Sequence, residues 1–261
     1  MAASRKARTA NTATRAAAKS AESFVIRRPE RGRLFLEITG TADLIQNNFS
    51  QKAMEQMLKK HMGISVQREK KNPRQCVEDA TIYNTDRRVC IPPAALKKAM
   101  LTAAAADKTL KKTRLRVDLY VEGSSIPITY DEVEPRMDMV RTAGIGRQPD
   151  VRFRPAFKNW KARVAITFDV DQVNHQSVVD LLNRAGSVGV GEWRPERDGT
   201  FGTFYVSRAI EDKDEQAEIA KECSVPLVPL KIPSWAMDAE IDADLLARVA
   251  KATDGEAEAA Q

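Results

Sequence analysis

The residues best suited to hold a phosphate lie in one glycine-rich stretch, GSVGVGEWRPERDGTFGTFYV, over residues 186–206. Glycine permits positive φ and lets a second backbone or a phosphate come close, and arginine supplies the charge opposite to a phosphate. The stretch therefore predicts a loop that receives a polyanion, although a glycine-rich turn that only stabilises the fold is the alternative. The candidate contacts are Gly186, Gly189, Gly191, Trp193, Arg194, Arg197, Gly199 and Gly202.

Two further stretches have the composition of a nucleic-acid surface. Residues 141–163 mix basic side chains with Phe153, Phe157 and Trp160, and a single strand needs both cations for its phosphates and flat rings for its bases. The alternative is that the three rings fill the core. Residues 63–74 are basic with little hydrophobic periodicity and predict a surface loop that contacts phosphates. The candidate basic residues are Arg141, Arg147, Arg152, Arg154, Lys158 and Lys161 in the first stretch, and Arg68, Lys70 and Lys71 in the second.

The segments around the glycine-rich stretch predict how it is held. Residues 163–170 alternate apolar and polar side chains, which indicates a strand. A helix follows, with Asp171 as its N-cap and Gly186 as the glycine that ends it, and residues 203–207 form a second strand. The glycines thus link a helix to a strand. Dinucleotide-binding fingerprints and P-loops place their glycines between a strand and the following helix, so both cofactor sites are excluded.

The helix, the basic glycine-rich loop and the sequence G-x-F-G-x-F-x-V that begins at Gly199 together resemble the signature loop of the RAMP superfamily. These are the RNA-binding proteins that build CRISPR effector complexes. The similarity covers residues 163–206, and IPPAALKKAM at residues 91–100 resembles a second passage common in that superfamily. The resemblance implies an RNA-recognition-motif-like (ferredoxin-like) core, with the loop against the RNA backbone, in a subunit that repeats along the strand.

Four other elements are expected. A first strand lies within residues 24–39, and Ser50 caps a helix whose methionines, Met54 and Met57, face the core. A helix over residues 94–106 follows Pro93. Residues 114–122 alternate so regularly that they predict the clearest strand of the chain, with Arg114, Arg116 and Tyr120 on its open face.

The predicted fold class is therefore α+β, with a ferredoxin-like core and insertions over residues 22–210. Residues 1–21 form a basic arm that cannot order itself, since they contain almost no large apolar side chain. Residues 211–261 form an acidic, proline-containing tail with a short helix around Ile241, Leu245, Leu246 and Val249. The tail carries thirteen acidic and five basic residues, so residues 1–210 hold a net charge of +14 within a chain of +6. Such a division favours a polyanion as partner, with the tail either shielding the basic body or docking on a neighbouring subunit.

Several classes of protein are excluded by what the sequence lacks. No apolar run approaches 18 residues, which predicts a cytoplasmic protein without membrane contact. The three cysteines show no CxxC spacing and only two histidines accompany them, so we expect buried or half-buried thiols, no metal site and no cofactor.

The sequence thus predicts a non-catalytic protein that binds RNA or single-stranded DNA through its phosphates and forms homo-oligomers along the strand, with other effector-complex subunits as further partners. One alternative is a scaffold or virion-associated interaction protein of a phage or mobile element. The other is an endoribonuclease like those of the same superfamily, in which His61 acts as general acid or base.

Overall fold

Two antiparallel sheets and six α-helices make up the part of the chain that the structure, a computed structural model, describes: residues 29–66, 70–105, 111–141 and 149–236. The basic arm at residues 1–21 and the expected helix around Leu245 lie outside these residues. Within the described ranges, none of the helices has the length and apolarity needed to cross a membrane.

The larger sheet has six strands in the order β3-β5-β8-β1-β9, with β4 also paired to β8. Its centre is the antiparallel pair of β1 and β8, in register from Arg31 opposite Asp169 to Thr39 opposite Lys161. The strands are β1 (Arg31–Gly40), β3 (Cys90–Ile91), β4 (Leu119–Val121), β5 (Ile126–Thr129), β8 (Lys161–Asp169) and β9 (Phe204–Ala209).

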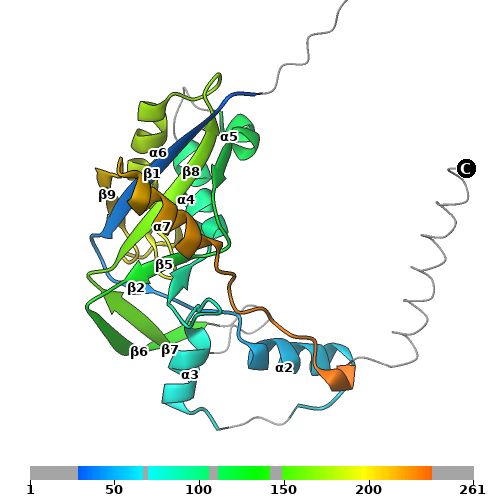
Figure 1. Cartoon of the computed structure of the whole chain (residues 1–261). Helices are drawn as coiled ribbons and strands as arrows, with labels where there is room; N and C mark the ends of the chain where they lie inside the picture. The colour runs from blue at the N-terminus through cyan, green and yellow to red at the C-terminus, as the bar shows by residue number, and fades with distance from the viewer. Residues whose placement is uncertain (1–28, 67–69, 106–110, 142–148, 237–261) are drawn as a thin grey trace, which may run out of the picture. The chain divides into compact units, whose positions relative to one another are not determined.

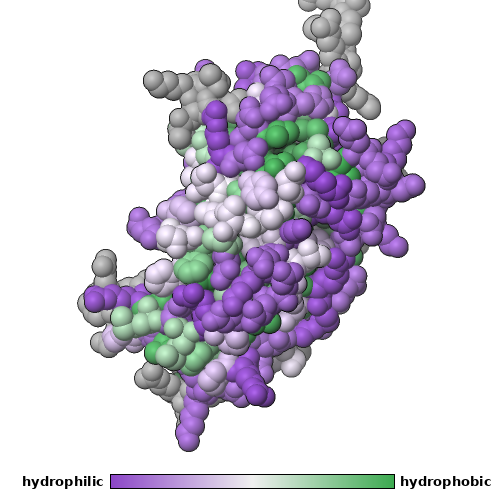
Figure 2. Space-filling model, turned by 90° about the vertical axis from the view of Figure 1, so that its left-hand side faces the viewer, coloured by the Kyte–Doolittle hydropathy of each residue, from purple (hydrophilic) through white to green (hydrophobic). Residues whose placement is uncertain are grey.

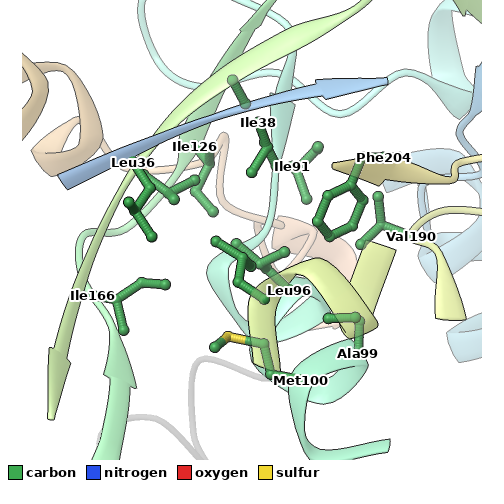
Figure 3. Packing of buried hydrophobic residues seen from close by; sticks show 14 of the residues in the cluster. Leu36, Ile38, Ile91, Leu96, Ala99, Met100, Ile126, Ile166, Val190 and Phe204 are labelled. Atoms are coloured by element: carbon green, nitrogen blue, oxygen red, sulfur yellow. The ribbon is translucent and has the colours of Figure 1, made fainter. Parts of the chain in front are cut away.

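Helices cover both faces of this sheet (Figure 1). On one face, α4 (Pro93–Ala105), α5 (Lys112–Asp118) and α6 (His175–Val188) bury the main core. There Leu36 and Ile38 of β1 meet Leu96 and Met100 of α4, as Figure 3 shows. On the other face, α7 (Lys213–Ser224) buries a smaller cluster. Because successive side chains of a strand point to opposite faces of the sheet, alternate residues of β1 and β8 pack against different layers of helices.

The smaller sheet combines a hairpin inserted between β5 and β8 with a short strand that follows β1. It consists of β2 (Leu44–Ile45), β6 (Glu132–Arg141) and β7 (Pro149–Lys158), in the order β2-β7-β6. β6 and β7 form a long hairpin that is paired from Glu132 opposite Lys158 to Arg141 opposite Pro149. Two helices accompany this sheet, α2 (Gln51–His61) and α3 (Pro73–Ala80), and α3 lies against β7.

The α+β class is confirmed, as are several elements. The strand expected at residues 163–170 is β8, and the strand at residues 203–207 is β9. Ser50 caps α2 by accepting a hydrogen bond from the backbone N–H of Ala53 at 3.2 Å. The helix after Pro93 is α4. His175 packs edge to face on Phe168 at the start of α6.

The strand expected over residues 114–122 is wrong for most of its length. Residues 112–118 form α5, and only Leu119–Val121 are extended. Leu115 and Leu119 are buried in the main core, whereas Val117 is exposed. A spacing of four places two side chains on one side of a helix just as it does on a strand, so tertiary packing decided between them.

The ends of α6 also differ from the prediction. Asn174, not Asp171, is the N-cap, and its side chain accepts from the N–H of Ser177 at 2.8 Å. Gly186 lies inside the helix, which ends at Gly189 with φ of +78°.

The methionines of α2 do not form core. No residue of α2 is buried, and Met57 is half exposed. This helix stands on the smaller sheet's side of the molecule, apart from the main core.

The acidic segment after residue 211 contains a helix that the sequence analysis did not anticipate. α7 is capped by Asp212 and buries Ile219 and Cys223 against the sheet. Its carboxylates pair with basic residues of the strands: Arg163 reaches Glu218 at 2.9 Å and Glu222 at 2.7 Å. Of the two roles left open for the tail, this part of it shields the basic surface of its own chain.

Candidate nucleic-acid interface

The glycine-rich loop after α6 is held by backbone hydrogen bonds to the body of the protein. The N–H of Gly202 donates to the carbonyl of Asp43 at 2.8 Å, and the N–H of Glu192 donates to the carbonyl of Ile45 at 2.9 Å. Across the loop itself, the N–H of Val190 donates to the carbonyl of Gly202 at 2.9 Å. The loop is therefore a fixed layer beside β2.

Close backbone contacts explain why this loop needs its glycines. A Cβ at Gly186 would lie 1.8 Å from the carbonyl oxygen of Phe204, so α6 and β9 touch only because residue 186 is glycine. A Cβ at Gly199 would lie 1.7 Å from the carbonyl oxygen of Trp193. Gly189, Gly191 and Gly202 have φ between +68° and +79°, which other residues adopt only with strain. All five glycines thus have a structural role, whatever else they contact.

Two of the predicted contact side chains of the loop are presented to solvent. Trp193, at a φ of +53°, is 40% exposed, and Arg197 ends the short 3₁₀ helix η1 (Pro195–Arg197) with its side chain exposed. Among the described residues Arg197 makes no ion pair, so its charge is available.

Arg194, in contrast, is occupied inside the loop. Its guanidinium donates to the carbonyl of Gly191 at 2.7 Å and to Glu196 at 2.7 Å. Burial alone would raise the pKa of Glu196, but hydrogen bonds from Arg194 and Thr102 hold that pKa below its usual value. Arg194 therefore stabilises the loop internally through Glu196, which also contacts Thr102 of α4.

The basic residues of the hairpin divide between three environments. Arg141, at the end of β6, and Arg152 are accessible, the latter 3.8 Å from Asp150. Lys158 lies between Glu132 and Glu134 at 3.2 and 3.0 Å. Lys161, the first residue of β8, lies on the face of the larger sheet that carries α7. It is therefore apart from Arg141, Arg152 and Lys158. Arg147 lies outside the described residues.

Arg154 is buried, with its side chain 3% exposed. Burial lowers the pKa of its guanidinium, partly offset by the nearby carboxylates of Glu192 and Asp138. Its Nη1 is 3.9 Å from Asp138, and neither Nε nor Nη1 has a hydrogen-bond partner. Because it is buried, the Arg154 side chain cannot reach a nucleic-acid strand on the surface.

One side chain connects the hairpin with the loop, and sequence reasoning missed it. The guanidinium of Arg136, on β6, lies 4.7 Å from the ring centre of Phe201 in the glycine loop. Arg136 is opposite Arg154 in the hairpin register and is bonded to Asp138 at 3.2 Å. Arg136 itself lies outside the predicted stretch 141–163, but its strand pairs with β7, which belongs to that stretch. The alternation of β6 was the available signal, since it places Arg136 and Asp138 on one side.

The opposite side of the hairpin is apolar and open. Met137 is 70% exposed, and Met139, Val133 and Val151 are also exposed. Figure 2 shows hydrophobic surface near the bottom of the molecule. This is the height at which Figure 1 draws β6 and β7. Phe157 and Trp160, two of the three rings expected here, are buried in the core.

A cavity of about 260 Å³ opens between the loop and the start of α4. Its walls include Ile91, Ala95 and Val190, and its rim carries Lys98 and Glu192. A cavity with apolar walls and a charged rim suits a ligand that contains a flat ring with polar groups at its edges.

The third basic stretch and the histidine lie elsewhere. Lys71 is tied to β7, donating to Asp150 Oδ1 and to the carbonyl of Val151, each at 2.5 Å. Lys70 is exposed, and Arg68 lies outside the described residues. His61 is exposed at the end of α2, which Figure 1 places apart from α6 and β9. Cys90 and Cys223 are buried and Cys76 is partly so, all as free thiols. The described residues contain no cluster of metal-ligating side chains.

Comparison with known proteins finds matches among solved structures only. No protein-family model matches the chain, and no curated protein does. Two of the similar solved structures carry the name Cmr.

One of them is a chain of the type III-B Cmr-beta complex bound to cognate target RNA, with 10% identity, a TM-score of 0.44 and coverage of 78% of this chain and 66% of that one. This protein therefore spans just under two thirds of that neighbour's length. Another is Cmr6 from Pyrococcus furiosus, with 10% identity, a TM-score of 0.34 and coverage of 69% of this chain and 100% of that chain.

Proposed function

We propose that the protein binds single-stranded RNA or DNA, without cleaving it, on the surface that joins the glycine loop to the β6–β7 hairpin. The observation that carries this proposal is the contact of Arg136 with Phe201, which joins the β6–β7 hairpin to the glycine loop. On that surface Arg152 and Arg197 supply cations, and Trp193 supplies an exposed ring. These are the two contributions that a sequence-independent single-strand site requires.

A ferredoxin-like core is part of the proposal. Its support is the succession β1, α4, β4 with β5, β8, α6 and β9, which alternates as β-α-β-β-α-β. β4 and β5 both pair with β8 and share one strand position beside it. In this arrangement the glycine loop lies between the second helix and the last strand.

Titration of a fluorescent single-stranded RNA, followed by anisotropy at several salt concentrations, tests the proposal. We expect Trp193→Ala to weaken binding by about 1–3 kcal/mol, the contribution of one stacked base. We expect Arg197→Ala to reduce the slope of log K against log salt by about 0.7, the value for one phosphate contact on a single strand. Lys221→Ala is the matched control, since Lys221 is exposed on α7. Equal affinities and slopes for all three variants and the wild type contradict the proposal.

Oligomerisation along the strand is the second part of the proposal. Electron microscopy before and after nuclease treatment tests it, because a strand-dependent assembly falls apart on digestion. An identical oligomer after digestion supports the scaffold alternative instead. Loss of RNA cleavage in His61→Ala, with binding retained, identifies the ribonuclease alternative.

A further inference from the structure

A group of basic side chains lies at the edge of the larger sheet, where β4 meets α4 and α5. Tyr120 of β4 is 40% exposed, and two cations lie close to its ring. The guanidinium of Arg31 is 5.0 Å from the ring centre, and Lys97 Nζ is 4.6 Å from it. Lys97 Nζ also donates to the carbonyl of Arg116 at 3.0 Å, which brings α5 to the same place. We call Arg31, Lys97, Arg116 and Tyr120 the edge cluster.

The charges of the edge cluster are held in place but are not neutralised. An aromatic ring attracts a cation through its quadrupole, and it carries no net charge that could cancel the charge of the cation. None of the three cations forms an ion pair with another described residue. The two carboxylates that flank β4 are already bound, since Asp118 lies 3.6 Å from Arg114 and Glu122 pairs with Arg33. The edge cluster therefore keeps three positive charges that an anion would balance.

The helix α4 connects the edge cluster with the glycine loop. Lys97 and Lys98 are consecutive residues on its side away from the main core. Lys97 reaches the edge cluster, whereas Lys98 lies at the rim of the cavity beside the loop. One turn further along, Thr102 Oγ1 donates to Glu196 of η1 at 3.2 Å. The exposed side of α4 thus lies between the glycine loop and the edge cluster.

We propose that a strand bound at the glycine loop continues over α4, and that the edge cluster binds its phosphates. This inference rests on the proposed function, because it assigns a further part of the same strand. Guanidinium and ammonium groups form charge-assisted hydrogen bonds with phosphate oxygens, whatever the base. Continuity with the loop favours a nucleic-acid strand over an acidic protein as the partner, since one polyanion then reaches both surfaces.

The dependence of binding on strand length tests the inference. Anisotropy titrations use oligouridines of about 4 to about 16 nucleotides, the usual range of single-strand site sizes. A strand that is long enough to reach the edge cluster should show a steeper salt dependence than the shortest one. In Arg31→Ala/Arg116→Ala we expect the slope of log K against log salt to fall by about 1.4 on the long strand, the value for two lost phosphate contacts. On the shortest strand the slope should not change.

A double variant of α7, Lys213→Ala/Lys221→Ala, is the matched control, because it removes the same charge from two exposed positions. If both double variants lose the same slope on the long strand, net charge explains the result and the inference is wrong. It is also wrong if self-association is lost in Arg31→Ala/Arg116→Ala while RNA binding is unchanged, since the cluster then contacts a protein.

Trp193→Ala separates failure of this inference from failure of the proposed function. Weaker binding of every strand in Trp193→Ala, with no effect of the edge-cluster variant at any length, rejects the inference alone. Absence of binding to all strands by the wild type rejects both. The inference is supported when the edge-cluster variant loses slope only on long strands and Arg31→Lys/Arg116→Lys, which keeps the charges, retains it.

Discussion

Replacement of Gly202 by alanine tests the view that the loop glycines serve close backbone packing. Gly202 has a φ of +68°, and a Cβ there would lie 1.8 Å from the carbonyl oxygen of Val190. Backbone atoms cannot move aside as a flexible side chain can. The loop must therefore shift away from Val190 to accept the new methyl group.

The structure sets the size of the effect. An alanine at positive φ costs about 1–2 kcal/mol. Gly202 also makes two backbone hydrogen bonds, to Asp43 and Val190, and a shift that breaks both costs about 0.5–1.5 kcal/mol for each. We expect Gly202→Ala to lower the free energy of unfolding by roughly 2–5 kcal/mol. For a domain of this size, that is a fall in Tm of roughly 4–20 °C.

Gly63→Ala is the matched control. Gly63 has a φ of +72°, yet nothing lies within 4 Å of its would-be Cβ, so this variant bears only the conformational cost. Urea denaturation of both variants measures the difference, with the slope m checked for constancy. If Gly202→Ala loses no more stability than Gly63→Ala, close packing is not the reason for the glycine.

Three further predictions concern a partly buried carboxylate, the cysteines and the N-cap of α6. Burial alone would raise the pKa of Glu222, but hydrogen bonds from arginines lower it, so its stabilisation is present above pH 4.5 and is lost as the pH falls through the lower folded-state pKa. Glu222→Gln should therefore cost more stability at pH 7 than at pH 3 in urea titrations, and equal losses contradict this. Burial raises the pKa of Cys223 to about 11, so a disulfide reagent should label only the partly exposed Cys76 quickly in the folded protein, and a fast phase that survives Cys76→Ser is the opposing result. Asn174→Ala removes the N-cap of α6 and should cost about 1 kcal/mol, which Asn174→Ser largely restores; a drop of similar size in both variants argues against the cap.

The sequence predicted correctly those elements whose hydrophobic pattern matches their burial in the fold. β8 alternates strictly and is buried on both faces, and α4 combines Pro93 with an alanine-rich helix, so each was predictable. α5 was not. Leu115 and Leu119 satisfy both periods, and contact with α4 selected the helix.

α7 shows a second limit of sequence reasoning. Its acidic side chains obscured the short apolar side made by Ile219 and Cys223. The partners that neutralise those acids, among them Arg163 and Arg208, lie on strands distant in sequence. Only the tertiary structure reveals that the helix and the strands are complementary.

The sequence did not indicate which side chains of the predicted binding stretches are exposed and which are buried. Trp193 and Arg197 are exposed, as a binding role requires. Arg154 has the same residue type as its accessible neighbour Arg152 and yet is buried, because the hairpin lies against the loop at that point. Which face of a strand is covered depends on contacts with residues that are distant in the sequence.

The hairpin enters and leaves the larger sheet at neighbouring points, since Thr129 of β5 is paired with Lys161 of β8. The cross-strand pairs beyond Arg136 and Arg154 are possible places to close the hairpin with a shorter turn, because none of their residues belongs to the main core. Removing two such pairs at a time withdraws the tip by about 7 Å and keeps each remaining side chain on its face, at 3.4 Å per residue. The length of this arm is thus a dimension that can change independently of the core, in evolution or by design.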